Sequence, residues 1–170
     1  MLAASQIADP LAVRAEEQAR AAGAEPDTAA ARGRTRYAIA TEHRVVLDLG
    51  DQVMVRRWCD VDSASLDAQS AELTIRWADG SGATTVTLSD AKPQAFARVF
   101  RERVQSSVVH AETVKLPGGG TVRVAVRRDE NDALFSEVIG DGRVRLDDPA
   151  TASVIVAAEA RVRESVGLPI

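Results

Sequence analysis

A two-residue alternation of apolar and polar side chains is the feature that most limits how this chain can fold. The clearest run lies between residues 71 and 77, where four apolar residues fall on one side: Ala71, Leu73, Ile75 and Trp77. Successive side chains of a β-strand point to opposite faces, so this spacing predicts a strand with one buried face. Such strands build antiparallel sheets with one face on the core and the other in water.

The same period recurs along most of the chain. It predicts further strands at about residues 37–41, 45–49, 53–55, 58–61, 84–88, 114–116, 121–127 and 134–139. Between them lie short stretches rich in Gly, Asp and Pro, such as residues 79–82 and 117–120, which are typical of tight turns. We therefore expect an antiparallel meander.

Two segments change to helical spacing. Over residues 91–107 the apolar residues recur at intervals of three and four, with Phe96 and Phe100 as the largest. A final helix is expected to begin at Asp148 and Pro149 and to stop at Gly167. Its apolar stripe consists of Ile155, Ala158, Val162 and Val166.

Residues 1–35 form an Ala-rich segment and linker in this interpretation. Asp9 and Pro10 favour a helix start, and a short edge strand around Leu11 and Val13 is the alternative. Disorder of this N-terminal segment is the third possibility. The segment at 24–36 contains Pro26 and Gly33 and is interpreted as a mobile linker. Because the first 30 or so residues carry few large apolar side chains, we expect them to be dispensable for folding.

Composition narrows the class of protein. A chain of 170 residues with 45% hydrophobic and 27% charged residues is typical of one soluble, folded domain. The net charge of −4 disfavours non-specific binding to nucleic acid or to anionic membranes. The single cysteine, Cys59, excludes an intramolecular disulfide, and the first residues do not resemble a signal peptide. The expected location is the cytoplasm.

No catalytic, cofactor-binding or metal-binding residues are predicted. The two histidines, His43 and His110, lie far apart in the sequence, and neither has a second His or Cys nearby as zinc sites usually do. Cys59 follows Trp58 in a predicted strand and is interpreted as a small buried hydrophobe. The glycines at 118–120 lead into a strand rather than a helix, so they indicate a hairpin turn and not a phosphate loop. The acidic residues at 129–132 lack the Gly and Glu positions of a calcium loop.

Two clusters of arginine remain open to a functional interpretation. Arg32, Arg34 and Arg36 precede the first strand of the meander, and Arg98, Arg101 and Arg103 lie on the middle helix. An ordinary solvated surface explains both clusters, since Glu102 lies within the second. Anion binding by the middle helix is the alternative.

Residues 37–109 resemble a bacterial pleckstrin-homology-like (PH-like) domain. The resemblance depends on residues 40–47 (ATEHRVVL), 55–61 (VRRWCDV) and 73–80 (LTIRWADG), together with the helix from Phe96 to Val104. It implies a bent, seven-stranded antiparallel sandwich or open barrel capped by the helix, and a binding module for lipids, peptides or proteins rather than an enzyme. The hairpin at 42–44 lacks a basic cluster, which argues against phosphoinositides. The whole chain further resembles uncharacterised proteins of high-GC Gram-positive bacteria.

These observations lead to one interpretation with two alternatives. The fold class is α+β, with a segment at 1–35, a PH-like domain at 36–110, and a C-terminal strand-hairpin-helix unit at 111–170. The leading hypothesis is a non-catalytic cytoplasmic interaction module that binds another protein or itself, with no nucleic acid, membrane lipid or cofactor. The alternatives are a small-molecule or anion binder that uses the middle-helix arginines, and an enzyme with a dispersed active site.

Overall fold

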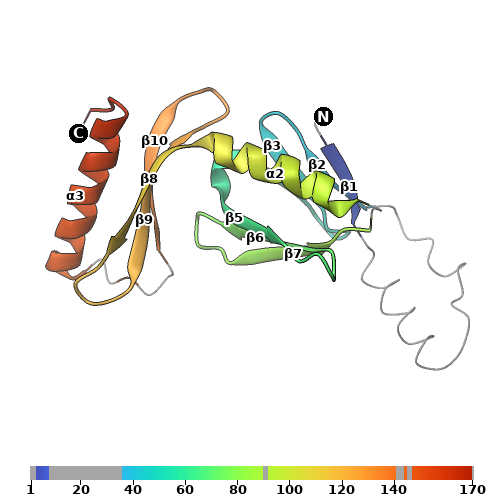
Figure 1. Ribbon diagram of the computed structural model, residues 1–170, viewed down its shortest axis with the longest axis horizontal. Helices are drawn as coiled ribbons and strands as arrows, with labels where there is room; N and C mark the ends of the chain where they lie inside the picture. The colour runs from blue at the N-terminus through green and yellow to red at the C-terminus, as the bar shows by residue number, and fades with distance from the viewer. Residues whose placement is uncertain (1–2, 8–35, 90–91, 141–143, 145–146, 170) are drawn as a thin grey trace, which may run out of the picture. The chain divides into compact units, whose positions relative to one another are not determined.

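A computed structural model describes residues 3–7, 36–89, 92–140, 144 and 147–169 of the chain. Within these residues the fold is mixed α+β, with three antiparallel sheets and two α-helices (Figure 1). The chain divides into two compact units that interleave along the sequence. The first unit comprises Met1–Arg56, Ser65–Thr74 and Thr85–Phe100, and the second comprises Arg57–Ala64, Ile75–Thr84 and Arg101–Ile170.

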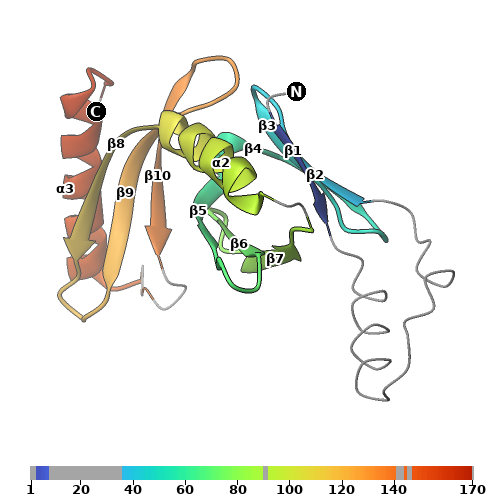
Figure 2. The ribbon, with the colours of Figure 1, turned by 45° about the vertical axis from the view of Figure 1, so that its right-hand side comes forward.

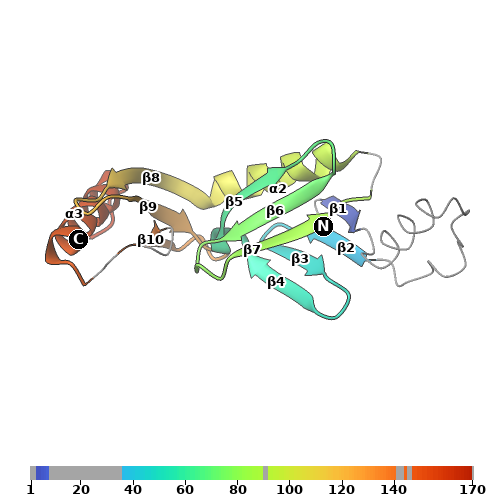
Figure 3. The ribbon, with the colours of Figure 1, turned by 90° about the horizontal axis from the view of Figure 1, so that it is seen from below.

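One sheet has four strands in the order β1-β2-β3-β4. Their bounds are Ala3–Ile7, Arg36–Ala40, Arg44–Asp48 and Val53–Arg57. The last three confirm strands predicted from the two-residue period. Ala38 lies opposite Leu47, and Ala40 lies opposite Val45, and all four side chains are buried. Figure 3 shows β2, β3 and β4 side by side.

Strand β1 corrects the expectation that no strand lies before Leu11. It pairs antiparallel with β2, with Ser5 opposite Ala38, and it also bridges Ile7 to Leu88. The side chains of Ser5 and Ile7 are buried. Ile7 is the only large apolar residue of the strand, so the hydrophobic signal is weak and backbone pairing defines the element. Residues 3–7 therefore belong to a sheet, and whether the chain folds without them stays a prediction.

Other expectations for the N-terminal segment lie outside the described residues. These are the helix at Asp9 and Pro10, the alternative strand around Leu11 and Val13, and the linker at 24–36 apart from Arg36, which begins β2. The domain boundaries near residues 36 and 110 stay predictions.

A second sheet has the strand order β5-β6-β7, with bounds Val61–Leu66, Glu72–Trp77 and Ala83–Thr87. Strand β6 confirms the predicted alternation, since Leu73, Ile75 and Trp77 are buried. Ala71 does not share their face as expected. Its φ of 54° places it in a turn before the strand. The turn at 79–82 is confirmed, with φ of 74° at Gly80 and 98° at Gly82, a backbone conformation that glycine adopts without strain.

A 3₁₀ helix, Trp58–Asp60, replaces the strand predicted at 58–61. The Asp60 carboxylate accepts a hydrogen bond from the backbone N–H of Arg57 at 2.9 Å and another from its guanidinium Nη2 at 2.7 Å. These local bonds favour a turn over an extended chain. Strand β5 follows directly. It was missed because only Val61 among its residues is buried.

Helix α2, Pro93–Ser107, confirms the helix predicted at 91–107, although Ala91 lies outside the described residues. Phe96 and Phe100 are buried, and their ring centroids lie 6.1 Å apart. They lie four positions apart in the sequence, so they share one face of the helix.

The third sheet and helix α3 belong to the second unit. The strand order is β10-β9-β8, with bounds Leu134–Gly140, Thr121–Arg128 and Val108–Lys115. Strand β8 is longer than the short strand predicted around Val114, and it begins where α2 ends. Helix α3, Pro149–Ser165, lies along one face of this sheet (Figures 1 and 2).

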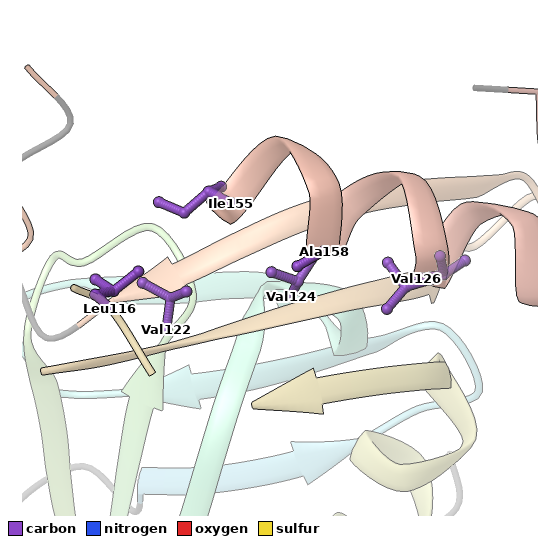
Figure 4. Packing of buried hydrophobic residues seen from close by; sticks show 7 residues of the cluster. Leu116, Val122, Val124, Val126, Ile155 and Ala158 are labelled. Atoms are coloured by element: carbon purple, nitrogen blue, oxygen red, sulfur yellow. The ribbon is translucent and has the colours of Figure 1, made fainter. Parts of the chain in front are cut away.

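A hydrophobic cluster joins α3 to this sheet. It contains Leu116, Val122, Val124, Val126, Ile155, Ala158 and Val162. Figure 4 shows Ala158 of α3 next to Val124 of β9. Full burial of one such Val, Leu or Ile side chain contributes about 1.5–3 kcal/mol, so the stripe predicted for the final helix stabilises this unit. Only Val166 of that stripe is partly exposed.

Both ends of α3 follow the sequence prediction. The Asp148 carboxylate accepts a hydrogen bond from the backbone N–H of Thr151 at 2.9 Å, and Pro149 occupies the first helical position. Gly167 has φ of 75° and ends the helix, and the N–H of Leu168 donates to the carbonyl of Arg163.

Candidate functional site

The residue types that usually carry catalysis or bind metals are dispersed. His43 lies in the turn before β3, with its Nε2 atom 3.9 Å from the Glu42 carboxylate, and His110 is exposed on β8. Cys59 is buried in the 3₁₀ helix, and burial raises the pKa of its thiol. In the part of the chain that the structure describes, no three His, Cys, Asp or Glu residues are grouped so as to hold a metal ion.

The arginines of the middle helix face solvent in part. Arg98 and Arg101 are exposed, and Arg103 is half-buried. Glu102 lies four residues after Arg98, so a carboxylate shares the helix face with the guanidinium. Arg32 and Arg34 lie outside the described residues. Arg98 and Glu102 therefore give this face of α2 a mixed charge, and anion binding by the middle helix stays a prediction.

Arg127 is the charged residue with the least expected environment. It lies on β9 and is wholly buried. Its Nε donates a hydrogen bond to the Glu137 carboxylate on β10, and its Nη1 donates to the Ser107 hydroxyl at 3.1 Å. Its Nη2 is buried and has no hydrogen-bond partner among the residues that the structure describes. The two-residue period puts Arg127 on the opposite face of its strand from Val124 and Val126, where a polar face is expected. Ala125, an apolar residue on the face of Arg127, was the available signal in the sequence that this face is covered too.

A second ion pair lies on the same face of β9. Nη2 of Arg123 donates hydrogen bonds to the carboxylate of Asp62 and to its backbone carbonyl, the latter at 3.2 Å. Burial raises the pKa of Glu137, and the guanidinium groups of Arg127 and Arg123 oppose that rise. Positive and negative groups therefore alternate within the second unit. Since each carboxylate is already bonded to a guanidinium, the chemistry is that of a structural network rather than of a proton-transfer site.

Strand β4 offers a different kind of surface, in the first unit. It is the outermost strand of its sheet. Val53 and Val55 are 54% and 48% exposed. They are two residues apart, so their side chains point to the same face of the strand. The strand was predicted from the sequence, but its outer position and its exposed valines were not.

Comparison of the chain with protein-family models, with curated proteins and with solved structures found no match. In the described residues, no helix is both long enough and apolar enough to cross a membrane.

Proposed function

We propose that this chain is a non-catalytic, cytoplasmic interaction module with a PH-like domain, and that it binds an extended segment of another polypeptide along β4. The order of elements supports the PH-like assignment. A four-stranded sheet, a three-stranded sheet and then helix α2 follow one another, which matches the seven strands and helix that the resemblance implies. The seventh strand is β1, so the elements that support the assignment begin at Ala3 and not at residue 37.

The observation that carries the binding proposal is the pair of exposed valines on an outermost strand. The outer side of such a strand presents backbone N–H and C=O groups to which a further strand can be added. Side chains at alternate positions then set specificity. Val53 and Val55 supply an apolar pair for the partner's own alternate side chains.

The first half of β4 carries no charged side chain that would hinder pairing with another strand. Natural edge strands avoid unwanted pairing with inward charges, proline or bulges. Residues 53–55 are Val, Met and Val, and the arginines follow only at 56 and 57. An apolar, unprotected edge is the kind of surface that protein-binding β modules present.

A photo-crosslinking residue placed at position 53 tests the proposal. We expect it to capture one stoichiometric partner, and we expect a synthetic peptide from the captured segment to bind the intact chain. The same crosslinker at Val156, a valine of α3 that is 65% exposed, is the matched control. A proline scan of the peptide then tests whether the peptide binds as an added strand. Strand addition predicts that proline at every second position abolishes binding, because it removes a backbone donor.

Two results would refute the proposal. One is equal crosslinking from positions 53 and 156. The other is a peptide that tolerates proline at all positions, since that peptide does not pair as a strand. Capture of a second copy of this chain at position 53 would keep the β4 surface and identify the partner as the chain itself.

A further inference from the structure

A cleft of about 650 Å³ lies within the second unit. Its walls come from the β6–β7 hairpin, the start of β9, the end of β10 and the first half of α3. The apolar residues of the lining include Trp77, Val122, Val138, Ile139, Val144 and Ile155, and Ala83 lies at the hairpin. Small-molecule sites have volumes of about 300–1,000 Å³ and are mostly apolar, so this cleft has the size and the surface of a ligand site.

Val138 shows that the apolar lining is not simply part of the core. It pairs with Val124 across the β9–β10 ladder and therefore lies on the sheet face that α3 covers. Val124 is fully buried there, whereas Val138 remains 38% exposed. The helix thus covers the middle of the sheet and leaves an apolar side chain of its outer strand at the cleft.

The charges of the lining balance one another. Asp62 is bonded to Arg123, so its charge is compensated within the protein. Arg76 and Asp79 lie three residues apart on the hairpin and carry opposite charges. A ligand with a net charge would lose hydration on entering without gaining a surplus counter-charge. An uncharged ligand avoids that cost.

We propose that this cleft binds an uncharged, largely apolar small molecule, such as an aromatic or terpenoid-like compound. The ligand packs against Trp77, Val138 and Ile155. This inference does not depend on the proposed function, because Val53 and Val55 belong to the first unit and the cleft belongs to the second.

Two fluorescent probes that share an aromatic body and differ in charge test the proposal on the full chain. Uncharged phenylnaphthylamine is expected to bind saturably with one site per chain and to receive energy from tryptophan. Its anionic relative, anilinonaphthalene sulfonate, is expected to bind at least about tenfold more weakly, because the sulfonate finds no surplus positive charge. Equal affinity for the two probes would overturn the preference for an uncharged ligand. The absence of saturable phenylnaphthylamine binding would overturn the site.

Two variants locate the binding. Val138→Asp introduces a carboxylate into the lining at a half-exposed position, and Ala83→Trp adds bulk from the β6–β7 hairpin at an exposed position. Each is expected to weaken phenylnaphthylamine binding by about tenfold or more while thermal unfolding stays cooperative. Val156→Asp on the exposed side of α3 is the control and should bind the probe as the parent chain does. If both lining variants fold and bind the probe unchanged, the ligand does not occupy this cleft.

Discussion

Arg127 of β9 and Glu137 of β10 form a buried ion pair between diagonal neighbours of one sheet face. The ladder sets Arg127 opposite Phe135 and Glu137 opposite Ala125, so the two charged residues are offset by two positions. Long side chains span such a diagonal. The pair connects the middle strand of the sheet to its outer strand, and Ser107 at the end of α2 accepts a further hydrogen bond from Arg127.

Removing one member of this pair should destabilise the chain strongly. Arg127→Met leaves the Glu137 carboxylate mostly buried without its guanidinium, and we expect a loss of about 3–5 kcal/mol in the free energy of unfolding. Urea denaturation measures this. The double variant Arg127→Met with Glu137→Gln should recover most of the loss, because no unpaired charge remains. Arg161→Met, which breaks an exposed pair with Glu112, is the control and should change little. Additive losses in the double variant would contradict the pairing.

The free energy of unfolding should depend on pH through the titration of Glu137. Burial raises the pKa of this carboxyl above its usual value of 4.5, so the folded chain holds the proton more firmly than the unfolded chain does. The contribution of this group to stability is therefore fully present below pH 4.5 and is lost as pH rises through the raised pKa. Denaturation of the parent chain and of Glu137→Gln over a pH series should show that the variant lacks this decline. Parallel curves for the two proteins would contradict the shift.

The side chain of Trp77 should contribute strongly to the free energy of unfolding, as a large core residue does. It is buried at the end of β6, and its indole Nε1 donates a hydrogen bond to the Thr84 hydroxyl at 2.9 Å. Trp77→Ala should cost about 3–5 kcal/mol in chemical denaturation. Trp77→Phe keeps most of the ring and loses the hydrogen bond, so its cost should be clearly smaller. A loss below about 1 kcal/mol for the alanine variant would show that the ring is not in the core.

Elements with a strong hydrophobic period could be predicted from the sequence, and elements without one could not. Strand β6 and helix α3 were predicted well because large apolar residues repeat there at two or at three to four positions. Strand β1 was missed because Ile7 is its only large apolar residue. Pairing with β2 defines it, and such pairing is a long-range property that local periodicity does not contain.

The candidate site was harder to predict than the fold. Burial of Arg127 depends on Glu137 and Ser107, which are 10 and 20 residues away in sequence. The exposure of Val53 and Val55 depends on β4 being the last strand of its sheet. Alternation of apolar and polar residues predicts where a strand lies in the sequence, but it does not predict which strands pair with it.

Strand β1 should be required for full stability. Ile7 is buried and bridges to Leu88, whereas Ala4 on the same strand is exposed. Ile7→Asp places a carboxylate without a partner in an apolar site, and we expect a loss of more than about 2 kcal/mol in the free energy of unfolding. Ala4→Asp is the matched control and should be nearly neutral. If the two variants unfold at the same denaturant concentration, β1 does not contribute to the core.

The chain should not bind anionic membranes in a salt-sensitive way, although the proposed PH-like assignment would make lipid the obvious ligand. Polybasic attachment gains about 1 kcal/mol per Lys or Arg near the membrane surface, so several must converge without acids between them. The β2–β3 turn offers Arg44 beside Glu42, and the exposed arginines of α2 share their helix with Glu102. The net charge of −4 opposes approach at long range. Co-sedimentation with phosphatidylserine vesicles should therefore show little bound protein at low and at physiological salt. Strong binding at low salt that falls steeply as salt is added would reveal a basic surface and make the lipid headgroup the leading ligand.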